Sequence, residues 1–288
     1  MKRKITAAVL LAALLLTACG SAGKTVPDPT QLPTAAPVPT ESASPAPEET
    51  AAPESEAPFV TVRVDREEET CSSDDTVLLY YSSERPRVEI PEHPQTAAAV
   101  NDVLEGDFVR FRDGEENQDY ASGREQYLAA AEEELTWRKQ NNGLDAFAPY
   151  ELRREIRVVR ADERVISITA VESTSMGGAH GYAGCSARNF DARTGALLQL
   201  EDLSEDPKTF LELCADLLWT ASRGGENALM AVAEGYFDGY EETLPDLLRD
   251  GNWYFSDEGL VFIANAYEIA PYASGTIEFT LPDRKSVV

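Results

Sequence analysis

Histidine and cysteine are scarce in this chain: two histidines and four cysteines occur among 288 residues. His93 and His180 are far apart in the sequence, no Cys-x-x-Cys pair occurs, and no regularly spaced acidic calcium loop is present. Zinc sites are built from closely spaced Cys and His, and calcium loops from acids at fixed positions. The sequence therefore predicts neither a metal centre nor a cofactor.

The chain also lacks Gly-x-Ser-x-Gly, the turn that presents a nucleophilic serine in α/β-hydrolases. Its many carboxylates single out no pair for glycoside hydrolysis. Acidic runs at residues 67–69 and 132–134 are typical of solvated faces. We therefore expect no catalytic residues and a protein that is not an enzyme.

Basic residues are few, with 25 Lys and Arg against 51 Asp and Glu and a net charge of −26. Nucleic acids and anionic lipid headgroups are bound through Lys and Arg, so neither is expected as a partner. An acidic surface instead favours a basic partner, because opposite charges accelerate encounter. The alternative is that the charge only keeps the protein soluble.

Long apolar runs are missing except near the N-terminus, where residues 5–18 are uncharged and rich in Ala and Leu. This run is shorter than the roughly 20 residues that span a bilayer. Three of the four residues before it are positively charged. A positive flank followed by a short apolar core is typical of a signal peptide, which we predict over residues 1–18.

The leader ends in Leu16-Thr17-Ala18-Cys19, which resembles the lipobox of bacterial lipoproteins. This resemblance implies diacylglycerol on the Cys19 sulfur and cleavage before that residue; the alternative is an ordinary secretory signal with a chance cysteine. Loss of the three positive charges of the leader takes the net charge from −26 to −29. Two or more acyl chains anchor a protein stably. The predicted location is therefore extracytoplasmic, with the lipid bilayer bound through acylated Cys19.

Residues 19–58 after the leader are dominated by Pro, Ala, Thr, Ser and Glu. Such a segment cannot bury enough apolar surface to offset its ordering entropy. Repeated proline favours polyproline II, at about 3.1 Å per residue. We expect a disordered linker that can hold a folded domain on the order of 100 Å from the membrane.

The remaining residues 59–288 show alternating and helical hydrophobic patterns in turn. Strands are expected over residues 59–64, 76–82, 87–90, 150–160, 164–174, 184–191, 253–255, 260–263 and 276–281. Helices are expected over 96–112, with Thr96 as N-cap, over 122–140, from 206 onward, over 226–239 and over 244–249. The order strand, helix, strand, helix, strand predicts an α+β fold of antiparallel sheets packed with helices.

A series of motifs follows in order: Ser-Met-Gly-Gly-Ala-His-Gly at 175–181, Asn-Phe-Asp-Ala-Arg-Thr-Gly at 189–195, Leu-Glu-Asp-Leu at 200–203 and Tyr-Glu-Ile-Ala-Pro-Tyr-Ala-Ser-Gly at 267–275. Over about residues 87–282 the series resembles the extracellular region of the RsiV family of lysozyme-sensing anti-sigma factors. The resemblance implies an N-terminal domain of the PdaC/RsiV type at 59–195 and an RsiV-type C-terminal domain at 196–288. It also implies a partner such as lysozyme, which is strongly basic. The cytoplasmic sigma-binding segment and membrane helix of RsiV, and the deacetylase domain of PdaC, have no counterpart here.

Two loops contain the candidate binding residues. The candidates are Ser175, Gly177, Gly178, His180, Tyr182, Tyr267, Pro271 and Tyr272. Glycines permit positive φ and close backbone approach, and tyrosines add contact area at little entropic cost. The alternatives are a structural loop whose imidazole caps a backbone group, and a second loop that folds back on the core.

The cysteines after the leader are Cys71, Cys185 and Cys214. Cys214 falls on an apolar helical stripe and is expected to be a buried thiol. Cys71 and Cys185 could form a disulfide in an oxidising compartment, although an odd count argues weakly for one.

These observations together predict a membrane-anchored binding module of the cell envelope that recognises a protein such as lysozyme or a wall-derived ligand, including peptidoglycan. The alternatives are a peptidoglycan-acting enzyme or enzyme accessory, and a structural lipoprotein of wall assembly.

Overall fold

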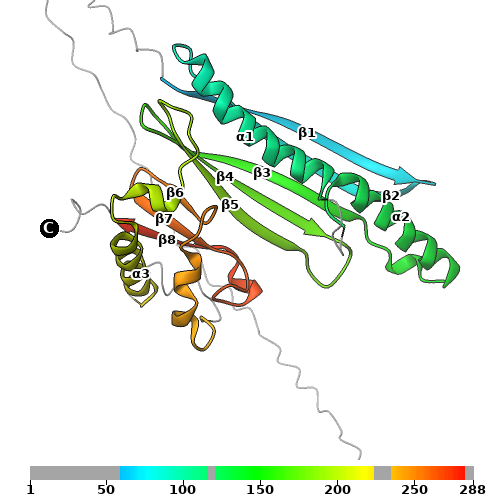
Figure 1. Ribbon diagram of the computed structural model, residues 1–288. Helices are drawn as coiled ribbons and strands as arrows, with labels where there is room; N and C mark the ends of the chain where they lie inside the picture. The colour runs from blue at the N-terminus through cyan, green and yellow to red at the C-terminus, as the bar shows by residue number, and fades with distance from the viewer. Residues whose placement is uncertain (1–58, 116–120, 224–234, 283–288) are drawn as a thin grey trace, which may run out of the picture. The chain divides into compact units, whose positions relative to one another are not determined.

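The computed structural model describes residues 59–115, 121–223 and 235–282. These residues form a five-stranded sheet and a three-stranded sheet packed with helices (Figure 1). The strand order of the larger sheet is β1-β2-β3-β4-β5. Its strands are β1 (Thr61–Ser73), β2 (Thr76–Glu89), β3 (Tyr150–Ala161), β4 (Val165–Ser175) and β5 (Tyr182–Asp191). The expected α+β class is confirmed.

Strands β1 and β2 form one long hairpin in place of the three short strands expected over residues 59–64, 76–82 and 87–90. The turn residues Asp74 and Asp75 have φ of 47° and 63°. Two consecutive positive φ angles match the twist of a two-residue hairpin turn. The outer strand β1 is charged and exposed over residues 63–70, as is typical of edge strands that must not pair with other chains.

Two helices connect β2 to β3, namely α1 (Pro94–Asp113) and α2 (Arg124–Gln140). Because the chain crosses over through them, β2 and β3 pair in parallel, and the expectation of purely antiparallel pairing was wrong at this position. Thr96 is not the N-cap. The helix begins at Pro94, and the Thr96 hydroxyl donates a hydrogen bond to the carbonyl of Arg193 (3.0 Å).

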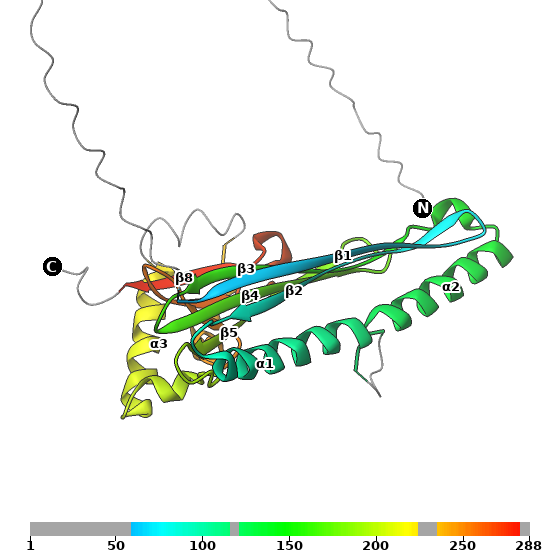
Figure 2. The same cartoon turned by 90° about the horizontal axis from the view of Figure 1, so that it is seen from above.

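Helices α1 and α2 follow one another along one face of the five-stranded sheet (Figures 1 and 2). Two core clusters lie under them, and their largest buried side chains are Leu78, Leu79, Tyr81, Ile166 and Phe190. Of the inward positions expected for the second helix, Tyr127, Ala131 and Leu135 are buried and Leu128 is half-buried. We refer to this face as the helix-side face.

The C-terminal part contains α3 (Pro207–Arg223) and a sheet of β6 (Trp253–Phe255), β7 (Gly259–Ala264) and β8 (Ile277–Pro282), in the order β6-β7-β8. Short 3-10 helices lie at η1 (Leu144–Ala146), η2 (Leu200–Leu203), η3 (Tyr240–Glu242), η4 (Leu244–Leu247) and η5 (Tyr272–Ser274). The helix expected at 244–249 is thus a 3-10 helix over its first four residues. Most of the helix expected at 226–239 lies outside the described residues.

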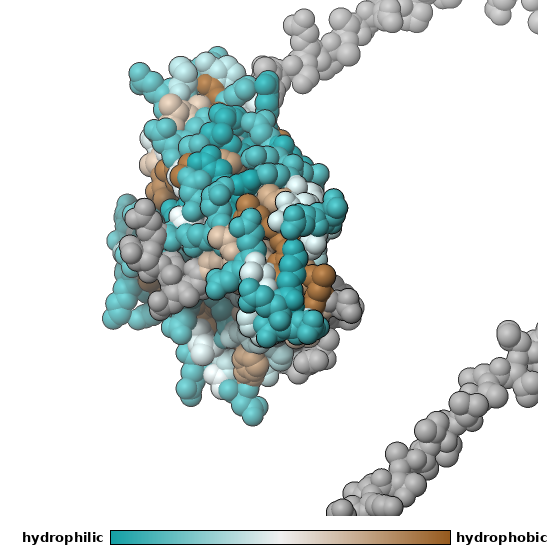
Figure 3. Space-filling model, turned by 90° about the vertical axis from the view of Figure 1, so that its right-hand side faces the viewer, coloured by the Kyte–Doolittle hydropathy of each residue, from teal (hydrophilic) through white to brown (hydrophobic). Residues whose placement is uncertain are grey.

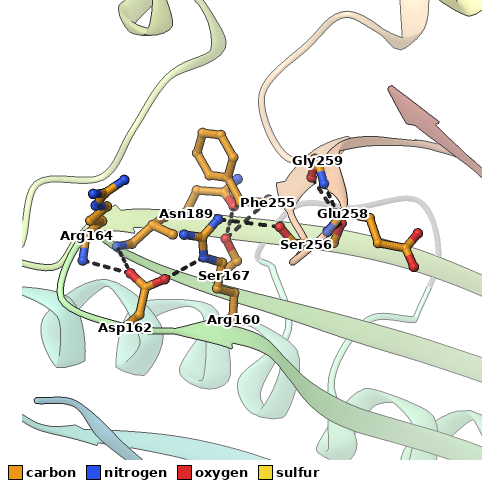
Figure 4. Close-up of polar contacts among 10 residues, drawn as sticks. Arg160, Asp162, Arg164, Ser167, Asn189, Phe255, Ser256, Glu258 and Gly259 are labelled. Atoms are coloured by element: carbon orange, nitrogen blue, oxygen red, sulfur yellow. Dashed lines mark hydrogen bonds and ion pairs between the residues drawn. The ribbon is translucent and has the colours of Figure 1, made fainter. Parts of the chain in front are cut away.

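A buried polar network joins the two sheets (Figure 4). The Ser167 hydroxyl donates to the side-chain oxygen of Asn189 (2.8 Å), and the Asn189 amide donates to the carbonyl of Trp253 (2.7 Å). The backbone N–H of Phe255 donates to the Ser167 hydroxyl (3.2 Å). Contacts therefore cross the predicted domain boundary at 195/196, which itself stays a prediction.

The cysteines after the leader are all buried and free. Cys71 packs under the helices, whereas Cys185 packs against the three-stranded sheet on the opposite face. Because the thiols lie on opposite faces of one sheet, they do not form the disulfide considered above. Within the described ranges, no helix combines the length and apolar character needed to cross a membrane.

Candidate functional site

The loop between β4 and β5 and the loop between β7 and β8 bring three aromatic side chains together. The imidazole of His180 stacks on the ring of Tyr272, with centroids 4.2 Å apart and planes 23° apart. Tyr267 lies beside Tyr272 at 5.8 Å between centroids, and its hydroxyl is 3.4 Å from Nε2 of His180. We call His180, Tyr267 and Tyr272 the aromatic cluster. Both loops were predicted to carry binding residues, and the structure joins them.

Asn265 fixes the second loop against the first. Its side chain accepts from the backbone N–H of Cys185 (2.7 Å) and donates to the carbonyl of the same residue (3.1 Å). The amide thus pairs with the edge of β5 as a neighbouring strand would. The Asn265 backbone N–H donates to Glu268 (2.7 Å), whose carboxylate also binds Arg249. The loop is therefore held at both its start and its turn.

Tyr267 adopts a backbone conformation that is rare for its residue type. Its φ is +71°, and its N–H donates to the carbonyl of Ala270 (3.0 Å). A left-handed conformation costs a residue with a Cβ roughly 1–2 kcal/mol. The side chain is nevertheless 52% exposed. Strain of this kind is concentrated at functional sites, and here it presents an aromatic ring to solvent.

The contacts of His180 agree with both interpretations of its loop, as a binding loop and as a structural loop whose imidazole caps a backbone group. Its Nδ1–H donates to the carbonyl of Gly181 (2.9 Å), so the ring caps a neighbouring backbone group. In that tautomer Nε2 accepts from the Tyr267 hydroxyl. The residue as a whole is exposed, so the same hydrogen bonds that hold the ring also orient it at the surface.

The glycines of the first loop differ in their roles. Gly177 has a φ of +72°, as expected for a tight turn, whereas Gly178 and Gly181 do not have positive φ. A Cβ on Gly181 would lie 2.4 Å from the carbonyl oxygen of Thr174, so this glycine is needed for close backbone approach. A Cβ on Gly178 would meet no heavy atom closer than 4.0 Å. Gly178 therefore has neither a positive φ nor a close backbone contact.

The other predicted residues surround the aromatic cluster. Ser175 is half-buried at the end of β4, opposite Glu151 of β3. Pro271 is the N-cap of η5, which carries Tyr272. Tyr182 is 50% exposed and lies over Gly184 on the helix-side face. Tyr182 lines a second feature of this surface.

That second feature is a groove of about 630 Å³ on the helix-side face, which the sequence reading missed. We call it the sheet groove. Its polar lining comes from α1, from β3 to β5 and from the residues before β6, and includes Asp107, Arg154, Glu172, Tyr182, Arg188 and Asn252. One residue of the groove could have been found from the sequence. Arg154 alternates with Leu152 and Ile156 along β3, so it occupies a position where an apolar, inward-facing side chain is expected.

Ion pairs line the sheet groove. Arg188 binds both carboxylate oxygens of Asp107 (2.8 and 3.0 Å), and Arg110 adds a contact of 3.0 Å to the same carboxylate. Arg154 pairs with Glu172 and lies over the ring of Phe111, 5.8 Å from its centroid. The groove thus combines fixed charges of both signs with an apolar lining.

Metal binding receives no support from the part of the chain that the structure describes, because no group of three His, Cys, Asp or Glu side chains there is placed to hold an ion. The view in Figure 3 shows a face on which hydrophilic residues predominate and hydrophobic ones form small separate patches. Any recognition on such a face depends on individual side chains rather than on one large apolar area.

Comparison with known proteins places a domain at the C-terminal end. Residues 221–284 match the family described as "Protein of unknown function (DUF3298)", so the chain contains a DUF3298 domain. A DUF3298 family member from Bacteroides fragilis has a similar structure, with a TM-score of 0.55 and 19% identity over 77% of this chain and 90% of that one. For a DUF3298 family protein from Pseudomonas aeruginosa the TM-score is 0.46 and the sequence identity is 17%, over 77% of this chain and 89% of that one. No curated protein matches the chain. At 19% identity, the likeness to the Bacteroides fragilis protein establishes the fold alone.

Proposed function

We propose that this chain is a membrane-anchored, extracytoplasmic binding module that recognises a protein partner through the aromatic cluster. The observation that carries the proposal is the stacked pair of His180 and Tyr272, which two loops hold at the surface beside exposed Tyr267. Aromatic side chains dominate the energetics of protein interfaces because they bury a large area at little entropic cost.

A basic protein such as lysozyme is the partner that the charge supports best. The net charge of −26 steers a cationic protein toward the surface, and the RsiV-like motifs include both loops of the aromatic cluster. Electrostatic steering raises the association rate and depends on salt, whereas short-range ring contacts determine the dissociation rate. A wall-derived ligand is the other partner consistent with the predicted location.

The location rests on the leader and on Cys19. A lipid on this residue, followed by a proline-rich linker, would hold the folded part outside the membrane, where envelope proteins are accessible. A module of this design acts as a sensor or a decoy for its partner.

Isothermal titration calorimetry with hen lysozyme at low salt tests the proposal. We expect binding by the full-length protein and a loss of about 30-fold in affinity, equivalent to about 2 kcal/mol, for Tyr272→Ala and for His180→Ala. Tyr80→Ala is the control, because Tyr80 is an exposed ring that belongs to β2 and to neither loop. Absence of heat with lysozyme would remove this partner, and equal losses for all variants would remove the aromatic cluster as the site.

The second candidate is a peptidoglycan-acting enzyme or enzyme accessory. It is favoured by one observation: an exposed imidazole, the side chain used most often in general acid–base catalysis, lies beside the Tyr267 hydroxyl, with Nε2 3.4 Å from it. Release of soluble fragments from purified cell walls, abolished by His180→Ala, would support it over the binding module.

A further inference from the structure

We infer that the sheet groove is a second binding site beside the aromatic cluster, which shares Asn265 with it, and that its ligand is a short extended peptide with a free carboxylate. Its volume of about 630 Å³ lies within the range of small-ligand pockets. Its lining mixes apolar side chains with fixed charges of both signs, which is the chemistry of a peptide rather than of a purely apolar ligand.

Two buried donors in the groove lack acceptors. Arg154 is 3% exposed and Asn252 is 7% exposed, and both line the groove. Nε of Arg154 and Nδ2 of Asn252 have no hydrogen-bond partner among the described residues. Leaving a buried donor unsatisfied costs about 1–3 kcal/mol, and more for a charged group. Both orphaned groups are N–H donors, so a ligand that satisfied them would supply acceptor oxygens.

The position of the charges favours an anionic group at Arg154. The side chain of Arg154 is 4% exposed, while that of its partner Glu172 is 42% exposed. The cation therefore lies deep in the groove and its counter-ion lies near solvent. A carboxylate that reaches Arg154 would form a charge-assisted hydrogen bond, which is about twice as strong as a neutral one.

The register of the sheet sets the length of the ligand. Arg154 lies opposite Glu172, and Glu172 lies opposite Gly184 on β5. Asn252 instead follows Gly251, whose carbonyl accepts from Ala187 further along the same strand. Gly184, level with Arg154, and Ala187, level with Gly251, are three residues apart on β5, a distance of roughly 10 Å. An extended peptide of three or four residues covers that distance, with its carboxylate at Arg154 and a backbone carbonyl at Asn252.

A saccharide of the same length fits the groove less well. Sugar rings are held mainly by stacking on accessible aromatic faces, whereas Phe111 and Tyr127 in the groove are buried and Tyr182 alone among its rings is exposed. The apolar lining formed by Leu152, Ile156 and Ile168 is better matched to peptide side chains.

Nuclear magnetic resonance titration of the full-length protein tests this site. The probes are N-acetylated Ala-Ala-Ala, Ala-Leu-Ala and Ala-Tyr-Ala, each compared with its C-terminal amide. We expect the Arg154 Nε–H and Asn252 side-chain amide resonances to shift with at least one free acid, and its amide to bind about tenfold more weakly. Ser186→Trp should block binding, because Ser186 lies on the exposed floor of the groove. Ser72→Trp, at an exposed position on β1, is the control.

The outcomes separate this inference from the proposed function. Peptide binding that persists in the Tyr272→Ala variant supports a distinct site. Absence of any shift with all three peptides at about 5 mM, a limit well above typical ligand affinities, would overturn the inference. Equal binding of acid and amide, or tighter binding of triacetylchitotriose, would overturn the assignment of a carboxylate-bearing peptide.

Discussion

His180 and Tyr272 stack face to face at 4.2 Å, although they belong to loops that are far apart in the sequence. The contact exists because the Asn265 side chain pairs with the backbone of Cys185 and holds the second loop at the edge of β5. The aromatic cluster is therefore a product of the fold, in which His180 and Tyr267 are exposed and Tyr272 is half-buried.

The first prediction concerns the strained backbone at Tyr267. Replacing Tyr267 with Gly relieves a φ of +71°, while Tyr267→Ala keeps the strain and loses the ring. We expect the Gly variant to exceed the Ala variant in free energy of unfolding by about 1 kcal/mol, measured by urea denaturation. Both variants should bind the partner more weakly than the parent, because both lack the ring. Equal stability of the two variants would contradict a strained conformation.

The second prediction concerns the polar network between the sheets. Asn189→Ala removes the acceptor of the Ser167 hydroxyl and the donor to the Trp253 carbonyl, leaving both groups buried. We expect a loss of about 2–6 kcal/mol in the free energy of unfolding, since each of the two buried unsatisfied groups costs about 1–3 kcal/mol. Ser186→Ala, at an exposed position on the same strand, should change it by less than about 0.5 kcal/mol. A small effect of Asn189→Ala would mean that the network is not needed to join the sheets.

The third prediction concerns alkaline pH. Burial raises the pKa of the thiols of Cys185 and Cys214 to about 11, and burial together with the nearby Glu278 carboxylate raises the pKa of Tyr254 to about 12. The unfolded chain loses these protons first, from a pKa of about 8.5 for thiols and about 10 for tyrosine. The contribution of these groups to the free energy of unfolding should therefore be fully present below the unfolded pKa values, and it should be lost as the pH rises from about 9 to about 12.

Urea denaturation at a series of pH values measures this decline, and Cys214→Ala should make it shallower by removing one titrating group. A free energy of unfolding that stays constant or rises in this pH range would contradict the burial of these groups.

The fourth prediction concerns location. Cys19→Ser removes the only acceptor sulfur of the predicted lipobox, so the protein should move from the membrane fraction to the soluble extracytoplasmic fraction. Immunoblotting of fractionated cells measures the change, with Cys71→Ser as the control cysteine. A Cys19→Ser protein that stays with the membrane would show that another feature anchors it.

Local periodicity was sufficient to predict much of the fold. The inward residues of α2 were identified because Tyr127, Ala131 and Leu135 recur at helical spacing. The full extent of β1 could not be predicted in the same way, because its residues 63–70 are exposed and do not alternate. The parallel pairing of β2 with β3 depends on contacts across the α1–α2 connection, which no local pattern reports.

The sequence indicated which residues belong to the candidate site, but it did not indicate how they are arranged. His180, Tyr267 and Tyr272 were identified from their loops, yet their mutual contact depends on long-range pairing through Asn265. The sheet groove was missed because its residues come from separate elements, each unremarkable in its own segment. Arg154 is the exception, since an arginine at a buried strand position indicates a polar requirement in the core.

The central claim is that a partner docks on the aromatic cluster, and fluorine NMR of 3-fluorotyrosine placed at position 272 tests it most directly. Titration with hen lysozyme at low salt should shift or broaden the signal at Tyr272, and a second protein labelled at Tyr80 should show no change. A signal at Tyr272 that stays constant while calorimetry records binding would contradict the claim, because the partner would then dock elsewhere.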